Sequence, residues 1–226
     1  MRLIVAAVLA VSVIGCAEAA DYPAMAPLAQ YQMNPTEEAA LARSAAPAAI
    51  SDRAEIMVMG SHGYETVAKG TNGFVCMVQR AWANNFDAPD FWNPRGRAPI
   101  CYNPAAARTV VPPYLKRTEW VLAGVPKAEM KARNAAAIAA KTFGPPDPGA
   151  MCFMMSKRAY LADDDPHWRP HLMHFVPPTT AAQWGANVPG SPVIGGGAGD
   201  DPYSTFLTPV PAWSDGTPGP AMPMAM

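Results

Sequence analysis

The sequence lacks the short motifs that mark several common enzyme classes. It contains no Gly-x-Ser-x-Gly elbow, no His-Glu-x-x-His, no Cys-x-x-Cys and no Walker phosphate-binding loop. A glycine-rich stretch at residues 195–199 is followed by Asp200, where a dinucleotide-binding fingerprint would place its third glycine. This stretch therefore indicates a flexible loop, and no familiar catalytic set is evident.

Charge is sparse as well. Charged residues make up 15% of the chain, the formal net charge is −1 and the pI is about 6.4. A nucleic-acid partner requires a basic surface that replaces the counterions of the phosphates, so this class of partner is not expected. No stretch after residue 14 is apolar and long enough to span a bilayer.

The N-terminus has the pattern of an export signal. Arg2 precedes residues 3–14, which are Leu, Ile, Val and Ala with one Ser. Twelve residues suit the apolar region of a signal peptide, whereas a membrane span needs roughly 20. We predict a signal sequence over residues 1–20 and a mature protein that is periplasmic or secreted.

Two ways of processing this signal remain open. The small residues of Ala17-Glu18-Ala19 form a cleavage site that would release a soluble protein. Val13-Ile14-Gly15-Cys16 instead resembles a lipobox, which would make Cys16 an acylated N-terminus that tethers the domain to a membrane. A membrane contact is expected only through such a lipid.

Proline shapes the rest of the chain. The 26 prolines exclude long helices and long central strands, so short elements joined by many loops are expected. Asn34-Pro35-Thr36-Glu37 is a cap followed by a first-turn proline and begins a helix that ends before Pro47. Asn103-Pro104 begins a second helix, which Pro112-Pro113 interrupts. The other helices are expected to end at residue 122 and to cover residues 126–142.

Strands are expected before and after these helices, at residues 54–59, 64–69, 74–78, 151–155, 171–176 and 205–210. Gly70-Thr71-Asn72-Gly73 favours a hairpin turn, so residues 54–82 are predicted to form a three-stranded meander. This order predicts an α+β fold with a mostly antiparallel sheet of about six strands and three or four helices. We expect a linker at 21–34, a single domain at 35–215 and a disordered tail at 216–226.

Three cysteines follow the signal segment. We favour a disulfide between Cys76 and Cys101, because Cys152 lies in the apolar run 151–155 and is expected to be a buried, inert thiol. The alternative is three reduced cysteines that pack as small hydrophobic residues.

Histidine offers a metal-site hypothesis. His167, His171 and His174 lie close together after three aspartates, and His62 or Asp165 could complete a zinc site of a metal-dependent hydrolase. However, His171 and His174 would point to opposite faces of a strand at 171–176. A strand with one partly buried histidine is the alternative.

Methionine offers a copper hypothesis. The chain has 14 methionines, and Met222, Met224 and Met226 form an alternating tail of soft thioether ligands of the kind that hold Cu(I). Met151, Met154 and Met155 form a second group. The alternatives are a low-complexity tail and ordinary core packing.

An aromatic loop spans residues 84–100. Phe86, Asp90, Phe91 and Trp92 line a binding surface if the loop is exposed. If it is not, the aromatic side chains cover the sheet.

Five blocks together resemble an uncharacterised family of exported bacterial proteins over roughly residues 36–215. They are Lys69-Gly70-Thr71-Asn72-Gly73-Phe74-Val75-Cys76, Ala98-Pro99-Ile100-Cys101, Gly149-Ala150-Met151-Cys152, Pro170-His171-Leu172-Met173 and Trp184-Gly185-Ala186-Asn187. The resemblance implies no activity and assigns no functional residue.

The leading hypothesis is thus an exported, non-catalytic domain that binds a small molecule or an envelope protein, with no cofactor expected. A zinc hydrolase at His167 and His171 and a copper-binding protein are the alternatives.

Overall fold

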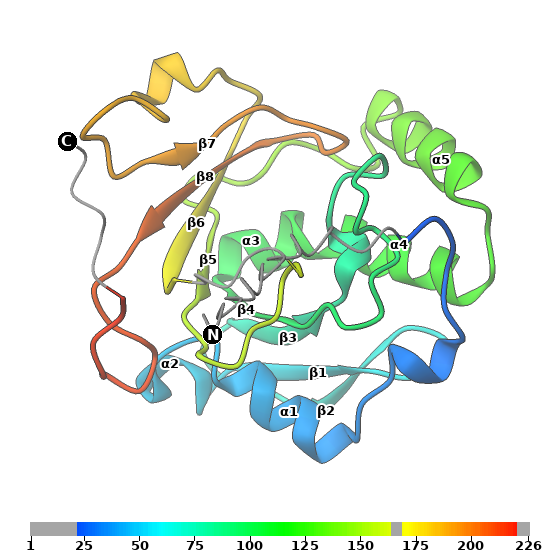
Figure 1. The fold of residues 1–226 in the computed structure, drawn as a ribbon, viewed down its shortest axis with the longest axis horizontal. Coiled ribbons are helices and arrows are strands. Elements are labelled where there is room, and N and C mark those ends of the chain that lie inside the picture. Colours follow the sequence, from blue (N-terminus) through cyan, green and yellow to red (C-terminus); the bar gives the residue numbers. More distant parts are fainter. Residues whose placement is uncertain (1–21, 164–168, 221–226) are drawn as a thin grey trace, which may run out of the picture.

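The computed structural model describes residues 22–163 and 169–220. Within these two ranges, no helix is long and apolar enough to cross a membrane. The chain forms one mixed sheet with helices on both faces (Figure 1).

The sheet has eight strands in the order β2-β1-β3-β4-β5-β6-β8-β7, and every neighbouring pair is antiparallel except β1 with β3. The α+β class with a mostly antiparallel sheet is therefore confirmed, but the expected number of six strands was too low. The strands are β1 (Glu55–Met59), β2 (Tyr64–Ala68), β3 (Val75–Gln79), β4 (Ala98–Tyr102), β5 (Met151–Met154), β6 (His171–Val176), β7 (Ile194–Gly195) and β8 (Ser204–Pro209).

The helices at Asn34 and Asn103 begin where their caps and prolines predict, but the short helix after Pro47 was not expected, and the expected number of three or four helices was too low. The described residues hold α1 (Pro35–Arg43), α2 (Ala48–Ser51), α3 (Pro104–Thr109), α4 (Val111–Leu122) and α5 (Lys127–Ala139), with single 3₁₀ turns at η1 (Leu28–Gln30), η2 (Ala81–Ala83) and η3 (Ala182–Trp184). The Asn34 side chain accepts hydrogen bonds from the backbone N–H groups of Thr36 and Glu37. Pro112 and Pro113 separate α3 from α4 by standing in the first turn of α4, where a missing N–H costs little.

The predicted meander is wrong in its connection. Strand β3 does not pair with β2; it pairs with β1 in parallel, on the far side of β1 from β2. Instead of a hairpin, residues 69–74 carry the chain past the start of β1. Thr71 donates its N–H to the carbonyl of Arg53, and Glu55 donates to that of Phe74. A Cβ atom at Gly70 would collide with the backbone of Ala54 and Glu55, so only glycine allows this crossing.

Strand β4 was expected to be a loop because Pro99 lies within it. Pro99 pairs with Val78 of β3, but β5 pairs only with Cys101 and Tyr102. At Pro99 the strand therefore has an edge character, and the absent N–H removes no bond to β5.

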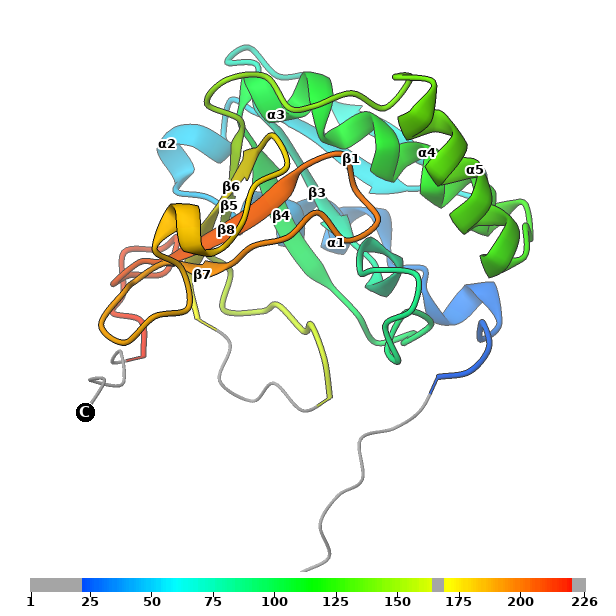
Figure 2. The same ribbon diagram turned by 90° about the horizontal axis from the view of Figure 1, so that it is seen from above.

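Two hydrophobic clusters lie on opposite faces of the sheet. One contains Leu41 of α1 together with Ile56, Val78 and both cysteines of the disulfide. The other lies beneath α3, α4 and α5, which run together over one face in Figure 2. The Cys76–Cys101 disulfide is present, with the two Cα atoms 4.0 Å apart in directly paired positions of β3 and β4. Cys152 is a buried free thiol, as expected.

Candidate functional site

A cavity of about 580 Å³ lies on the face of the sheet that carries α3 and α4. Every second residue along β6 and β8 lines this cavity. His171, Met173 and Phe175 of β6 line it, and so do their direct partners on β8, which are Pro209, Leu207 and Thr205. Paired and alternate residues share one face of a sheet, so these side chains form one continuous surface.

The part of this surface formed by β5, β6 and β8 is apolar. Its members are Met154, Met173, Phe175 and Leu207, and we call them the apolar floor. Ile194 of β7 pairs with Leu207 and is exposed, so its side chain extends the floor toward solvent. Such a surface can bind the hydrocarbon part of a ligand.

Charged residues from residues 79–98 and α4 form another side of the cavity. Arg80, Asp90, Arg97 and Arg117 belong to it, and we call them the charged wall. Arg117 donates to the carbonyls of Trp82 and Asn84, at 3.1 Å each, and forms an ion pair of 3.3 Å with Asp201, which also lines the cavity. Burial raises the pKa of Asp201, and Arg117 opposes that rise.

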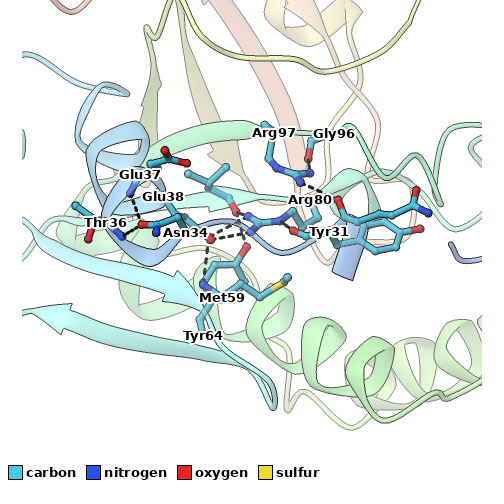
Figure 3. Close-up of polar contacts among 12 residues, drawn as sticks. Tyr31, Asn34, Thr36, Glu37, Glu38, Met59, Tyr64, Arg80, Gly96 and Arg97 are labelled. Atoms are coloured by element: carbon cyan, nitrogen blue, oxygen red, sulfur yellow. Dashed lines mark hydrogen bonds and ion pairs between the residues drawn. The ribbon is translucent and has the colours of Figure 1, made fainter. Parts of the chain in front are cut away.

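The charge of Arg80 is neutralised by the carboxylate of Glu38. Its guanidinium donates two bonds to the Glu38 carboxylate, at 2.8 and 3.0 Å, and neither side chain is exposed to solvent (Figure 3). The same carboxylate accepts the N–H of Met59, and Arg80 also donates to the carbonyl of Tyr31. The pair therefore joins α1, β1 and the end of β3 behind the charged wall.

Arg97 is bound differently. Its guanidinium donates to the carbonyls of Gln30, Pro94 and Gly96, at 3.0, 2.9 and 2.7 Å. Burial lowers the pKa of Arg97 to about 10, and the nearby charge of Arg80 acts in the same direction. Arg97 remains protonated at neutral pH, but its environment disfavours the charge.

The two described histidines of the predicted metal cluster diverge. His171 lines the cavity, and its Nδ1 lies 3.0 Å from the carbonyl oxygen of Arg169, to which it donates a hydrogen bond because a carbonyl oxygen can only accept. His174 lies on the other face of β6, with its ring 6.2 Å from that of Trp184, and burial lowers its pKa. The expected divergence is confirmed, and these two residues cannot share an ion.

The remaining candidate ligands do not assemble a site in the described residues. His62 lies exposed in the turn between β1 and β2. Residues 22–163 and 169–220 contain no group of three or more His, Cys, Asp or Glu side chains placed to hold a metal ion. The residues Cys16, Asp165, His167, Met222, Met224 and Met226 lie outside the described ranges.

Burial and strand position bear on three other sequence hypotheses: the aromatic loop, the methionines of β5 and the thiol of Cys152. Phe86 and Phe91 are fully buried and Trp92 nearly so, so the aromatic loop covers the core and only Asp90 of this group lines the cavity. Met151 and Met154 alternate across β5, and Met154 belongs to the apolar floor. Burial raises the pKa of the Cys152 thiol far above its ordinary value, which makes it a poor nucleophile.

Sequence reasoning did not identify the cavity. Its members come from residues 79 to 209, and each resembles an ordinary core or loop residue when read locally. Arg80 and Arg97 stand on either side of the aromatic residues Phe86, Phe91 and Trp92 in the sequence, and this is the one local signal that could have indicated the charged wall.

Searches against protein-family models, curated proteins and solved structures found no match for this chain.

Proposed function

We propose that this protein is an exported, non-catalytic binding domain that holds a small, partly apolar molecule in the cavity between α4 and strands β5, β6 and β8. One observation carries the proposal: a cavity of about 580 Å³ combines an apolar floor with a few charged groups on one side. Ligand sites typically measure roughly 300–1,000 Å³ and have this mixed lining.

The chemistry of the lining supports binding rather than catalysis. The carboxylates of Glu38, which is buried behind the cavity, and of Asp201, which lines it, both form ion pairs with arginine, so neither is poised as a general base. The free thiol of Cys152 is held protonated by burial. The disulfide supports an oxidising compartment, as the export signal predicts.

The neutral, apolar dye Nile red tests this proposal. We expect saturable binding with a rise in fluorescence when the dye enters the cavity. Leu207→Trp should fill part of the apolar floor and weaken binding by at least ~10-fold, which corresponds to about 1.4 kcal/mol.

Thr208→Trp is the matched control, because Thr208 is the next residue on β8 and faces away from the cavity. Circular dichroism establishes that both variants are folded. Absence of saturable binding to the folded protein, or equal weakening by both substitutions, would refute the proposal.

A further inference from the structure

We infer that the ligand of this cavity is an amphipathic anion, whose acid group is neutralised by Arg97 while its apolar body lies on the floor formed by Met154, Met173, Phe175 and Leu207. This inference rests on the proposed function and names the chemical class of the molecule bound.

The hydrogen-bond partners of Arg97 are all uncharged. All three of its hydrogen bonds go to backbone carbonyls, which are neutral acceptors. The ion pairs formed within the described residues do not include Arg97. A guanidinium that is partly withdrawn from water and lacks a carboxylate partner is costly, and a bound anion would remove that cost.

The neighbouring charges do not supply this compensation. Glu38 is committed to Arg80 through two hydrogen bonds, and Arg80 itself repels the charge of Arg97. Asp201 is paired with Arg117, and Asp90 accepts a hydrogen bond from the Asn84 side chain at 2.8 Å. In the described ranges neither of the paired carboxylates forms an ion pair with Arg97, and Asp90, whose hydrogen-bond donor is a neutral amide, is not paired with it either.

Arg117 adds a second sign of unused donor capacity in the same wall. Its side chain is 4% exposed, and its Nε atom has no acceptor among the described residues. Its guanidinium also lies 4.5 Å from the ring centre of Phe86. The charged wall thus offers guanidinium groups that lack a full set of partners among the described residues, whereas the apolar floor offers hydrocarbon.

The charged wall and the apolar floor together disfavour a ligand that is only apolar and a ligand that is only charged. A neutral hydrocarbon would leave the charge of Arg97 uncompensated, and a small inorganic anion would leave the apolar floor in contact with water. A cationic amphiphile would place like charges together. A carboxylate on a hydrocarbon chain or ring satisfies both ends at once.

Three probes with the same ten-carbon chain and different head groups separate these classes: decanoate, decanol and decyltrimethylammonium. Each is titrated against the Nile red complex of the full mature chain at pH 7.5, below its micelle-forming concentration. We expect decanoate to displace the dye at concentrations at least ~10-fold lower than the other two, as one charge-assisted contact predicts.

Substitutions then locate the charge. Arg97→Gln should reduce decanoate affinity ~10-fold and abolish the preference for decanoate over decanol, whereas Arg97→Lys should retain most of that preference. Arg95→Gln is the matched control, because it removes the same charge only two residues away in the sequence. The Arg95 side chain is 62% exposed and forms an ion pair with Asp163.

The outcomes distinguish this inference from the proposed function. Nile red binding without a preference for decanoate, or a preference that survives Arg97→Gln, overturns the anion assignment and leaves the binding function intact. Failure of the folded wild-type chain to bind Nile red and all three probes overturns both. If Arg97→Gln does not fold, Arg97→Lys and the wild-type probe series still decide the question.

Discussion

Glu38 carries its charge in a place that water does not reach. Its neighbour on α1, Glu37, is exposed, although both residues belong to the first turn of the same helix. What separates them is the guanidinium of Arg80, which is 42 residues away in the chain and forms a two-bond pair with Glu38. Removing one partner from such a pair leaves a buried charge without compensation.

We therefore expect Glu38→Ala to lower the free energy of unfolding by about 3–5 kcal/mol. Glu37→Ala should cost less than ~1 kcal/mol, because it removes only an exposed charge near the helix N-terminus. Urea denaturation of both variants measures the difference. Comparable losses in the two variants would show that the buried pair contributes no more than a surface charge.

At this scale the sequence predicts little of the site. The run Glu37-Glu38 gives no indication of which carboxylate is buried, and Arg97 has the same local setting as Arg95. Burial depends on the register of distant segments, which local patterns do not encode. The disulfide is the exception, since the contrast between Cys101 and the apolar surroundings of Cys152 was enough to predict the Cys76–Cys101 pair.

Helices α1 and α3 begin in the same way, with an asparagine cap followed by proline, but the two asparagine side chains differ in what they bind. In the part of the chain that the structure describes, the Asn34 side chain forms hydrogen bonds only with its own helix. The Asn103 side chain accepts from the N–H of Ala106 and of Met151, and donates to the carbonyl of Gly149. Asn103 therefore also holds α3 against the start of β5.

We expect Asn34→Ala to cost about 1 kcal/mol of stability, the ordinary value of a helix cap. Asn103→Ala should cost at least ~1 kcal/mol more, because two further hydrogen bonds are lost. Thermal and urea unfolding of the two variants provide the comparison. Equal destabilisation would mean that the contacts of Asn103 with β5 contribute nothing.

Elements with local signals were largely predictable, and those that depend on tertiary context were not. Caps and prolines set the starts of α1 and α3, and apolar runs located β1, β3, β5 and β6. Strand β4 was missed because Pro99 is tolerated only through the short pairing of β5. The crossing at Gly70 was read as a hairpin, because glycine permits both a tight turn and a close backbone approach, and the sequence does not tell them apart.

For the whole molecule, the disulfide acts mainly on the unfolded chain. Cys76 and Cys101 are 25 residues apart and directly paired in the sheet, so the native strands are close together with or without the bond. In the chain-entropy model, a loop of this length stabilises the folded state by about 3.5 kcal/mol.

Guanidinium unfolding of the oxidised protein, and of protein refolded in reductant, tests this value without changing any side chain. We expect the reduced protein to be less stable by about 3.5 kcal/mol, with Cys152 a free thiol in both samples. Intact mass establishes the redox state. Identical midpoints would show that the bond does not constrain the unfolded chain.

The position of β8 sets when the cavity can exist. Met173, Phe175 and Leu207 come from the last third of the chain, whereas the charged wall is complete by Arg117. A growing polypeptide that has reached residue 200 contains the arginines and both cysteines of the disulfide, but it has not yet supplied the strand that completes the floor. The proposed binding of a ligand therefore requires a chain that extends through β8, because a chain truncated before β8 would keep Met154, Met173 and Phe175 but lack Leu207 and the strand that completes the floor.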